Sequence, residues 1–309
     1  MNQPPLLEKS LAPGATIVPP TGVSTQRRAA ASGWQRRLLE FRHDWPLHVV
    51  LILALLIAFA PLGLMVIISF KNMGQFFAAP LSLTFPLEWE NYVIAFNVLK
   101  RSILNSTFMA VMVIILSIGI AALSAYVFAM FQFPGRDFLF WLYLSVMFVP
   151  GILTLTTRYI LVQRLGLLDT YWVQILPYVA TAQVFQTVIL RSFFAGLPKE
   201  VIEAAKVDGA GVLRIFWQIV LPMSRPILAT LAVMRAIGFW DEWLWPMITV
   251  LEWDVRPVAL QVFYLQGNVG GHVGYQMAGY VISSLPLVIL FALASKQFVR
   301  GLTSGAIRL

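Results

Sequence analysis

Six long apolar runs constrain this chain more than any other feature of its sequence. A helix needs roughly 20 residues to cross the hydrocarbon core of a bilayer, and the first run, Leu47–Phe70, contains no Asp, Glu, Lys or Arg. Only 12% of the chain is charged and 59% is apolar, whereas about a quarter of a soluble domain is charged. The pattern predicts an all-α polytopic membrane protein with six transmembrane helices. The other five runs are Ile103–Met130, Phe138–Thr157, Trp172–Phe194, Ile227–Val250 and Gly274–Phe298.

The residues before the first run have a different character. Residues 1–46 are rich in Pro, Ser, Thr, Gly and Ala and lack periodic apolar positions, a composition typical of disordered chain. We therefore expect a largely disordered N-terminal tail followed by a membrane domain over residues 47–309.

The basic residues predict the orientation. Six crossings place both termini on one side, and cytoplasmic loops carry the excess of Lys and Arg. Of the 22 Lys and Arg residues, fifteen lie on the side of the termini, six lie on the other side, and Arg235 lies inside the fifth run. This bias predicts that both termini are cytoplasmic, in a multi-pass protein of a bacterial plasma membrane. The net charge of +8 therefore reflects topology, and no nucleic-acid partner is expected.

One amphipathic insert, residues 198–222, interrupts the apolar chain between the fourth and fifth runs. Pro198 and Glu200 are typical of a helix start, and Gly209 and Gly211 allow a sharp turn. Apolar residues at helical spacing then predict a second helix. These residues leave two interpretations open: a hairpin that lies on lipid headgroups, or a docking element whose small residues let a partner approach. The stripe of the second helix is Val212, Ile215, Phe216, Ile219 and Val220.

The insert resembles the EAA loop of ABC-importer permeases. The family pattern is E-A-A-x(3)-G-x(9)-I-x-L-P, and every fixed position matches here. Further stretches, including "LGLLDTYWVQILPYVA" and "FWDEWLWPMITV", are similar to the carbohydrate-uptake branch, in particular to the second permease subunit of maltose importers. The matching residues are Glu203, Ala204, Ala205, Gly209, Ile219, Leu221 and Pro222.

The resemblance implies a coupling role for the insert. In this family it docks on a cytoplasmic ATPase, with Glu203 paired to a basic residue and Gly209 making the turn. The coupling set implied for this chain is Glu203, Ala204, Ala205, Asp208, Gly209, Leu221 and Pro222. ATP and Mg would then bind the ATPase, and this chain would not be an enzyme; it has no G-x-x-x-x-G-K-[ST] loop and no expected cofactor or metal site. The partners implied are a second homologous permease, two copies of the ATPase, an extracytoplasmic solute-binding protein and membrane lipid.

Charged and aromatic residues near the end of the fifth run are candidates for a solute path. Trp240, Asp241, Glu242 and Trp243 combine acids, which can hold sugar hydroxyls, with aromatic rings, which can cover a sugar face. The alternative is an interfacial aromatic belt with acids at its water edge. We expect Glu242 at least to face a water-accessible cavity.

Polar residues in two other runs carry the same ambiguity. Tyr178 and Asn105 are path candidates, yet polar side chains between helices more often hydrogen-bond their neighbours. Interhelical bonding is the favoured role for most of the polar residues of the fourth run, namely Gln174, Tyr178, Thr181, Gln183, Gln186 and Thr187.

The function expected is a permease subunit of an ATP-driven importer for a carbohydrate, sugar derivative or polyol. It would form half of the pathway and work by alternating access. Two rivals stay open at this point: a transporter driven by an ion gradient, which an internal inverted repeat would favour, and a membrane scaffold that only recruits a cytoplasmic protein.

Overall fold

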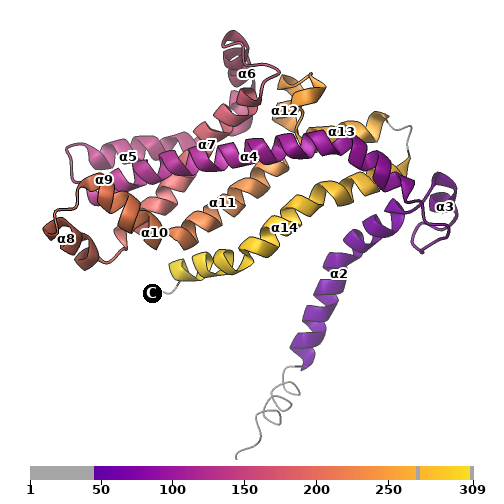
Figure 1. Ribbon diagram of the computed structural model, residues 1–309, viewed down its shortest axis with the longest axis horizontal. Coiled ribbons are helices and arrows are strands. Elements are labelled where there is room, and N and C mark those ends of the chain that lie inside the picture. Colours follow the sequence, from indigo (N-terminus) through magenta and orange to yellow (C-terminus); the bar gives the residue numbers. More distant parts are fainter. Residues whose placement is uncertain (1–44, 269–271, 307–309) are drawn as a thin grey trace, which may run out of the picture. The chain divides into compact units, whose positions relative to one another are not determined.

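The computed structural model describes residues 45–268 and 272–306, and the chain divides into a unit ending at Ala58 and a unit beginning at Phe59. The predicted disordered tail lies almost wholly outside the described residues. The described part is helical and contains no strand, which confirms the all-α class (Figure 1). Its longer helices are α2 (Trp45–Ser69), α4 (Glu90–Met130), α5 (Arg136–Ser145), α6 (Leu155–Arg164), α7 (Tyr171–Ala195), α8 (Lys199–Val207), α11 (Arg225–Trp240), α13 (Val258–Asn268) and α14 (Val273–Ala306).

Short elements join these helices. They are α3 (Met73–Ala78), α9 (Val212–Ile215), α10 (Leu221–Met223), α12 (Leu244–Thr249), the 3₁₀ turns Val146–Phe148, Gly151–Thr154 and Trp253–Val255, and a π-helical turn over Phe216–Val220. Four helices in the described chain, α2, α4, α7 and α14, are long and apolar enough to cross a membrane, and two bent pairs raise the number to as many as six.

Four of the six predicted spans are confirmed as single helices. The predicted bounds of the first and fourth spans differ from α2 and α7 by no more than two residues. Helix α4 begins thirteen residues before its predicted start. At 1.5 Å per residue its 41 residues extend about 60 Å, roughly twice the thickness of the hydrocarbon core. The extra turns therefore reach beyond the bilayer.

The third predicted span, Phe138–Thr157, is not one continuous helix. The chain bends by 85° between residues 148 and 151. Val149 has extended backbone angles, because a residue before proline is pushed out of the helical region, and Pro150 has no N–H to donate. The run is therefore split between α5 and α6.

The fifth predicted span, Ile227–Val250, is also wrong as a single helix. Helix α11 ends at Trp240, and α12 starts only after the polar residues Asp241 and Glu242. At its other end α11 joins α10 across a 74° bend at Ser224. The hydroxyl of Ser224 donates to the Val220 carbonyl at 2.7 Å, and Pro226 occupies the first turn of α11. Pro222 lies inside α10.

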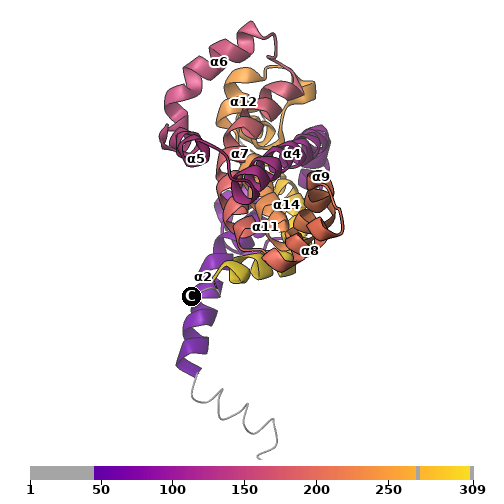
Figure 2. The same cartoon turned by 90° about the vertical axis from the view of Figure 1, so that its left-hand side faces the viewer.

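The centre of the second unit is the pair α4 and α7, which lie side by side in both views (Figures 1 and 2). Helices α8, α9 and α10 gather at one end of this pair, and α12 lies towards the other. Ala121, Ala122 and Ala125 of α4 are buried against Leu190 and Phe194 of α7. Small residues let two helices approach closely, so this contact fixes the end that carries the amphipathic insert.

Candidate coupling surface and polar cavities

The predicted turn of the insert is a Schellman motif centred on Gly209. The N–H of Ala210 donates to the Ala205 carbonyl at 2.9 Å, and the N–H of Gly209 donates to the Lys206 carbonyl at 3.0 Å. Gly209 has φ of 76°, the left-handed conformation that this motif requires and that glycine adopts without steric cost. Gly211 is extended, with φ of −68°. The turn therefore depends on Gly209 alone.

The first helix of the insert, α8, presents one face to the core. Ile202 is buried and Ala205 packs against the same cluster. Val201 and Ala204 are exposed. The exposed side also carries Glu203. An acid and small or apolar residues thus share an open surface.

The second half of the insert anchors it to the long helices. Ile215, Phe216 and Val220 are buried as predicted, whereas Val212 is exposed. The Tyr126 hydroxyl of α4 donates to the Val212 carbonyl at 3.1 Å, and the Tyr126 and Phe216 rings lie 5.1 Å apart. The buried residues therefore anchor the insert to α4, while its outer residues are exposed.

The seven implied coupling residues do not all share that outer surface. Glu203, Ala204, Asp208 and Gly209 are exposed. Ala205 and Leu221 pack against the core cluster, and Pro222 is half-buried in α10. We define the coupling surface as the four exposed residues, with the remaining three supporting the fold beneath it.

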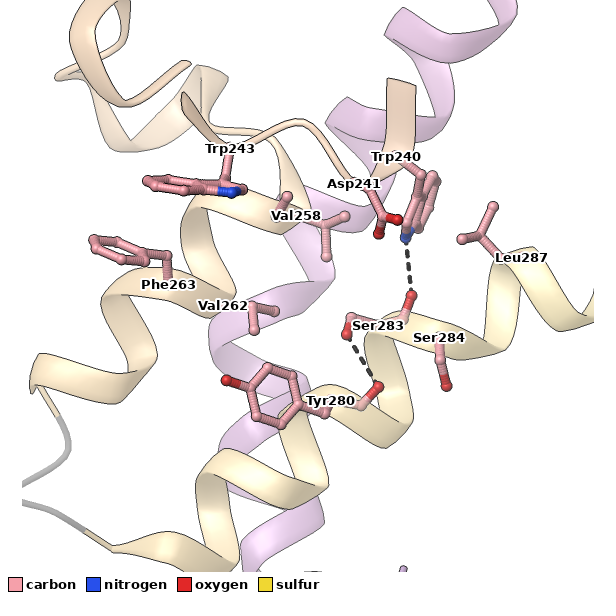
Figure 3. A pocket seen from close by; sticks show the side chains of 11 residues that line it. Trp240, Asp241, Trp243, Val258, Val262, Phe263, Tyr280, Ser283, Ser284 and Leu287 are labelled. Carbon is pink, nitrogen blue, oxygen red and sulfur yellow. Dashed lines mark hydrogen bonds between the residues drawn. The ribbon is translucent and has the colours of Figure 1, made fainter. Parts of the chain in front are cut away.

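A cavity of about 410 Å³ lies beside the end of α11 (Figure 3). Trp240 and Asp241 line one side of it, and the Trp240 ring nitrogen donates to the Ser283 carbonyl at 3.0 Å. Trp243 lines it as well and stacks on Phe263, with ring centres 5.3 Å apart and planes inclined by 12°. The cavity thus combines a carboxylate with aromatic faces, and eight of its eleven lining residues come from α13 and α14.

Glu242 does not line this cavity. Its Oε1 accepts from the Trp245 backbone N–H at 3.1 Å, at the first turn of α12. Glu242 also lies within electrostatic reach of Arg235 and Tyr178. Of the two neighbouring acids, Asp241 rather than Glu242 faces the open space of this cavity.

Asn105, a path candidate, is hydrogen-bonded to three other residues. Its amide donates to the carbonyls of Asp254 at 2.7 Å and Arg256 at 3.1 Å, and its oxygen accepts from the Tyr171 hydroxyl at 2.9 Å. Every polar atom of this buried side chain is therefore engaged. It ties the loop after α12 to α4 and α7.

Several polar residues of α7 join helices, as favoured from the sequence. Gln174 donates to Thr249 at 3.1 Å. The Tyr143 hydroxyl donates to Gln183 at 3.0 Å and lies 3.3 Å from the Thr187 hydroxyl. These contacts hold α12 and α5 to α7.

Tyr178 belongs to a charged cluster that the sequence did not reveal. The Arg235 guanidinium lies over its ring at 4.9 Å, and Arg158 is also within electrostatic reach. Arg158 comes from α6, Tyr178 from α7 and Arg235 from α11. These residues come from three separate helices, and the one signal in the sequence was an Arg inside an apolar run.

Comparison with known proteins gives the family. A family model described as binding-protein-dependent transport system inner membrane component matches residues 92–304. The chain belongs to this family of importer permeases. As an inner-membrane permease subunit of a binding-protein-dependent importer, it is neither an ion-gradient transporter nor a scaffold.

Relatives and a solved structure agree with this membership. The permease is 34% identical over 263 residues to a probable ABC transporter permease, YurM, of Bacillus subtilis, covering 84% of this chain and 87% of that one. It is 32% identical to the diacetylchitobiose uptake permease NgcG of Streptomyces coelicolor, covering 84% and 88%. It is also 32% identical to the sn-glycerol-3-phosphate permease UgpE of Yersinia pestis, covering 84% and 95%. Its fold matches a chain of a bacterial alginate ABC importer with a TM-score of 0.70 at 20% identity, covering 84% and 98%.

Proposed function

We propose that this permease forms one half of the path for a carbohydrate or sugar derivative and that its insert couples the path to a cytoplasmic ATPase. Relatives named for diacetylchitobiose, arabinooligosaccharides and sn-glycerol-3-phosphate support this solute class. A second permease would supply the other half of the path, and two ATPase copies would bind ATP and Mg. An extracytoplasmic binding protein would deliver the solute; a related alginate importer has been solved with such a protein.

The observation that carries the coupling role is the contrast between the two faces of the insert. Its inner face is anchored through Ile202, Ile215 and Phe216, whereas Glu203 and Asp208 stand exposed beside an apolar rim. Val207 is 88% exposed and Leu213 is 67% exposed. Exposed acids and bases are interspersed on the insert, so its charge alone does not favour the negative cytoplasmic leaflet. A protein partner with basic residues fits this surface better.

The proposed mechanism is alternating access. When ATP closes the ATPase pair, the coupling surface moves with it, and the anchored insert carries that movement to α4 and α11. The path then opens outward to receive solute, and hydrolysis resets it inward. In this path we place Asp241, Trp240 and Trp243, which share the cavity in Figure 3. We also place Tyr178 and Glu242 in the path, although they do not line that cavity. We leave Asn105 out because its polar atoms are fully engaged.

Reconstitution of the complete importer tests the coupling role. Glu203→Ala is expected to lower binding-protein-stimulated ATP hydrolysis and sugar uptake at least tenfold, because removal of one partner of a docked charge pair costs about 2 kcal/mol or more. Arg214→Ala removes an exposed charge whose Nε donates to Gln218 in the following turn; it serves as the matched control and should retain both activities. Normal activity of Glu203→Ala at wild-type abundance would exclude coupling through this surface.

A further inference from the structure

A second cavity, of about 360 Å³, lies between α7 and α11. Its polar wall consists of Arg235, Gln186 and Thr181, and its apolar wall includes Phe185, whose ring is 43% exposed. A cation, an amide, a hydroxyl and an aromatic face thus meet in one space. These are the groups that hold a polyhydroxy compound with a negative charge.

Arg235 and Gln186 have unused hydrogen-bonding capacity. The Nε and Nη2 atoms of Arg235 are buried without a hydrogen-bond partner among the described residues, and so is the Oε1 atom of Gln186, a side chain only 3% exposed. A buried polar group without a partner costs free energy. These three atoms are closed to solvent in this conformation, so a solute reaches them only when the two side chains turn toward the cavity that they line.

The charges around the cavity favour an anion. Tyr178, which lies under the Arg235 guanidinium, is within reach of two cations, Arg235 and Arg158, and of the carboxylate of Glu242. Within residues 45–268 and 272–295, Arg235 forms no ion pair with a carboxylate within 4.0 Å; the ion pairs there join Asp137 to Arg136 and Arg191. Among the residues that line this cavity, Arg235 is the one that carries a charge, and that charge is positive.

The position of Arg235 along α11 argues against a lipid headgroup as the anion. Arg235 lies ten residues after the start of α11, about 15 Å along the helix axis, which is half the thickness of the hydrocarbon core. A charged side chain at this depth costs roughly 2.5–3.5 kcal/mol on insertion scales and faces a protein cavity or a solute pathway.

We propose that this cavity is an anion subsite of the solute path and that the permease imports an acidic sugar derivative, one that carries a carboxylate or phosphate beside its hydroxyls. Arg235 binds the anionic group, the Gln186 amide and Thr181 hydroxyl bind solute hydroxyls, and Phe185 covers an apolar face of the sugar. This inference rests on the proposed function for the solute class, but the charge preference of the cavity is its own property.

Cysteine labelling measures that preference without knowledge of the natural solute. The chain has no cysteine, so Thr181→Cys introduces a single thiol at the cavity wall, and the mass of this subunit reports its reaction in the complete importer in nanodiscs. We compare an anionic methanethiosulfonate carrying a sulfonate with a cationic one carrying trimethylammonium. Arg235→Gln should lower the ratio of anionic to cationic rates on the order of tenfold, because one full charge is removed nearby.

Two further variants make the result specific. Arg235→Lys keeps the charge and should keep most of the ratio. Arg225→Gln removes an exposed charge from the start of the same helix and should leave the ratio unchanged. An unchanged ratio in Arg235→Gln would overturn the proposal. So would a thiol that reacts with neither reagent in nucleotide-free or nucleotide-bound importer, because the second permease would then fill the space.

Protection by added solutes tests the acidic sugar itself. D-glucuronate or sn-glycerol-3-phosphate should slow the labelling of Thr181→Cys at least threefold, and which of them does so separates carboxylate from phosphate. D-glucose should not slow it, and Arg235→Gln should remove the protection. If neither acid protects, or D-glucose protects equally, the acidic class is wrong. Labelling needs no turnover, so the two proposals can fail separately. If the labelling prediction fails, Glu203-dependent uptake of a neutral sugar can still be observed. If all sugar uptake fails, the ratio of anionic to cationic labelling rates can still be measured.

Discussion

At the scale of single residues, Gly209 and Gly211 provide a matched pair. An added Cβ would meet no atom within 4 Å at either position, but only Gly209 has a positive φ. Gly209→Val should therefore lower the stability of the turn by about 1–2 kcal/mol, the cost of a left-handed conformation for a side-chain-bearing residue. Gly211→Val should change it little.

Limited proteolysis of the insert measures this difference. Cleavage by trypsin after Lys206 and after Arg214 should be faster in Gly209→Val than in Gly211→Val, at equal membrane abundance. Equal cleavage of the two variants would show that backbone conformation at Gly209 does not hold the turn. This part of the site was predictable, because the spacing of the motif marked Gly209 and the motif needs a left-handed residue there.

At the scale of helices, the start of α14 packs closely on the segment between α2 and α4. A Cβ at Gly274 would overlap the Lys71 carbonyl oxygen and the Asn91 side chain. Asn91 itself donates to the carbonyls of Ser69 at 2.8 Å and Lys71 at 3.0 Å, so the neighbours cannot easily move. Gly274→Ala should cost about 1–3 kcal/mol through overpacking.

Gly119 in α4 offers the control, since an added Cβ there meets nothing within 4 Å. Thermal inactivation in detergent should begin at a lower temperature in Gly274→Ala and stay near the wild-type value in Gly119→Ala. A normal midpoint for Gly274→Ala would mean that α14 shifts to accept the methyl group.

At the scale of the whole molecule, orientation is the remaining test of the charge bias. A cysteine at Gly211 should react with a membrane-impermeant thiol reagent only from the cytoplasmic side, and one at Ser82, in the exposed segment after α3, only from outside. Reactivity with the sides exchanged would reverse the topology.

Apolar run length predicted the continuous spans well, because the hydrocarbon core fixes how much apolar helix a crossing needs. The same criterion failed at Pro150 and at Asp241, where local backbone chemistry ends a helix inside an apolar region. Some of the residues that line the cavity in Figure 3 could be predicted from the sequence, and others could not. Trp240 and Asp241 are adjacent in sequence, but Tyr280 and Ser283 join them only through packing of α14, which no local pattern encodes.

The attachment of the insert has a mechanical consequence. Tyr126 bonds it to α4, and the bend at Ser224 leads directly into α11. Under the proposed coupling role, a displacement of α8 would reach two long helices at separate points. Arg235 and Trp240 lie on the part of α11 far from the bend, so a rotation of α11 about the 74° bend would move them further than it moves the residues beside Ser224.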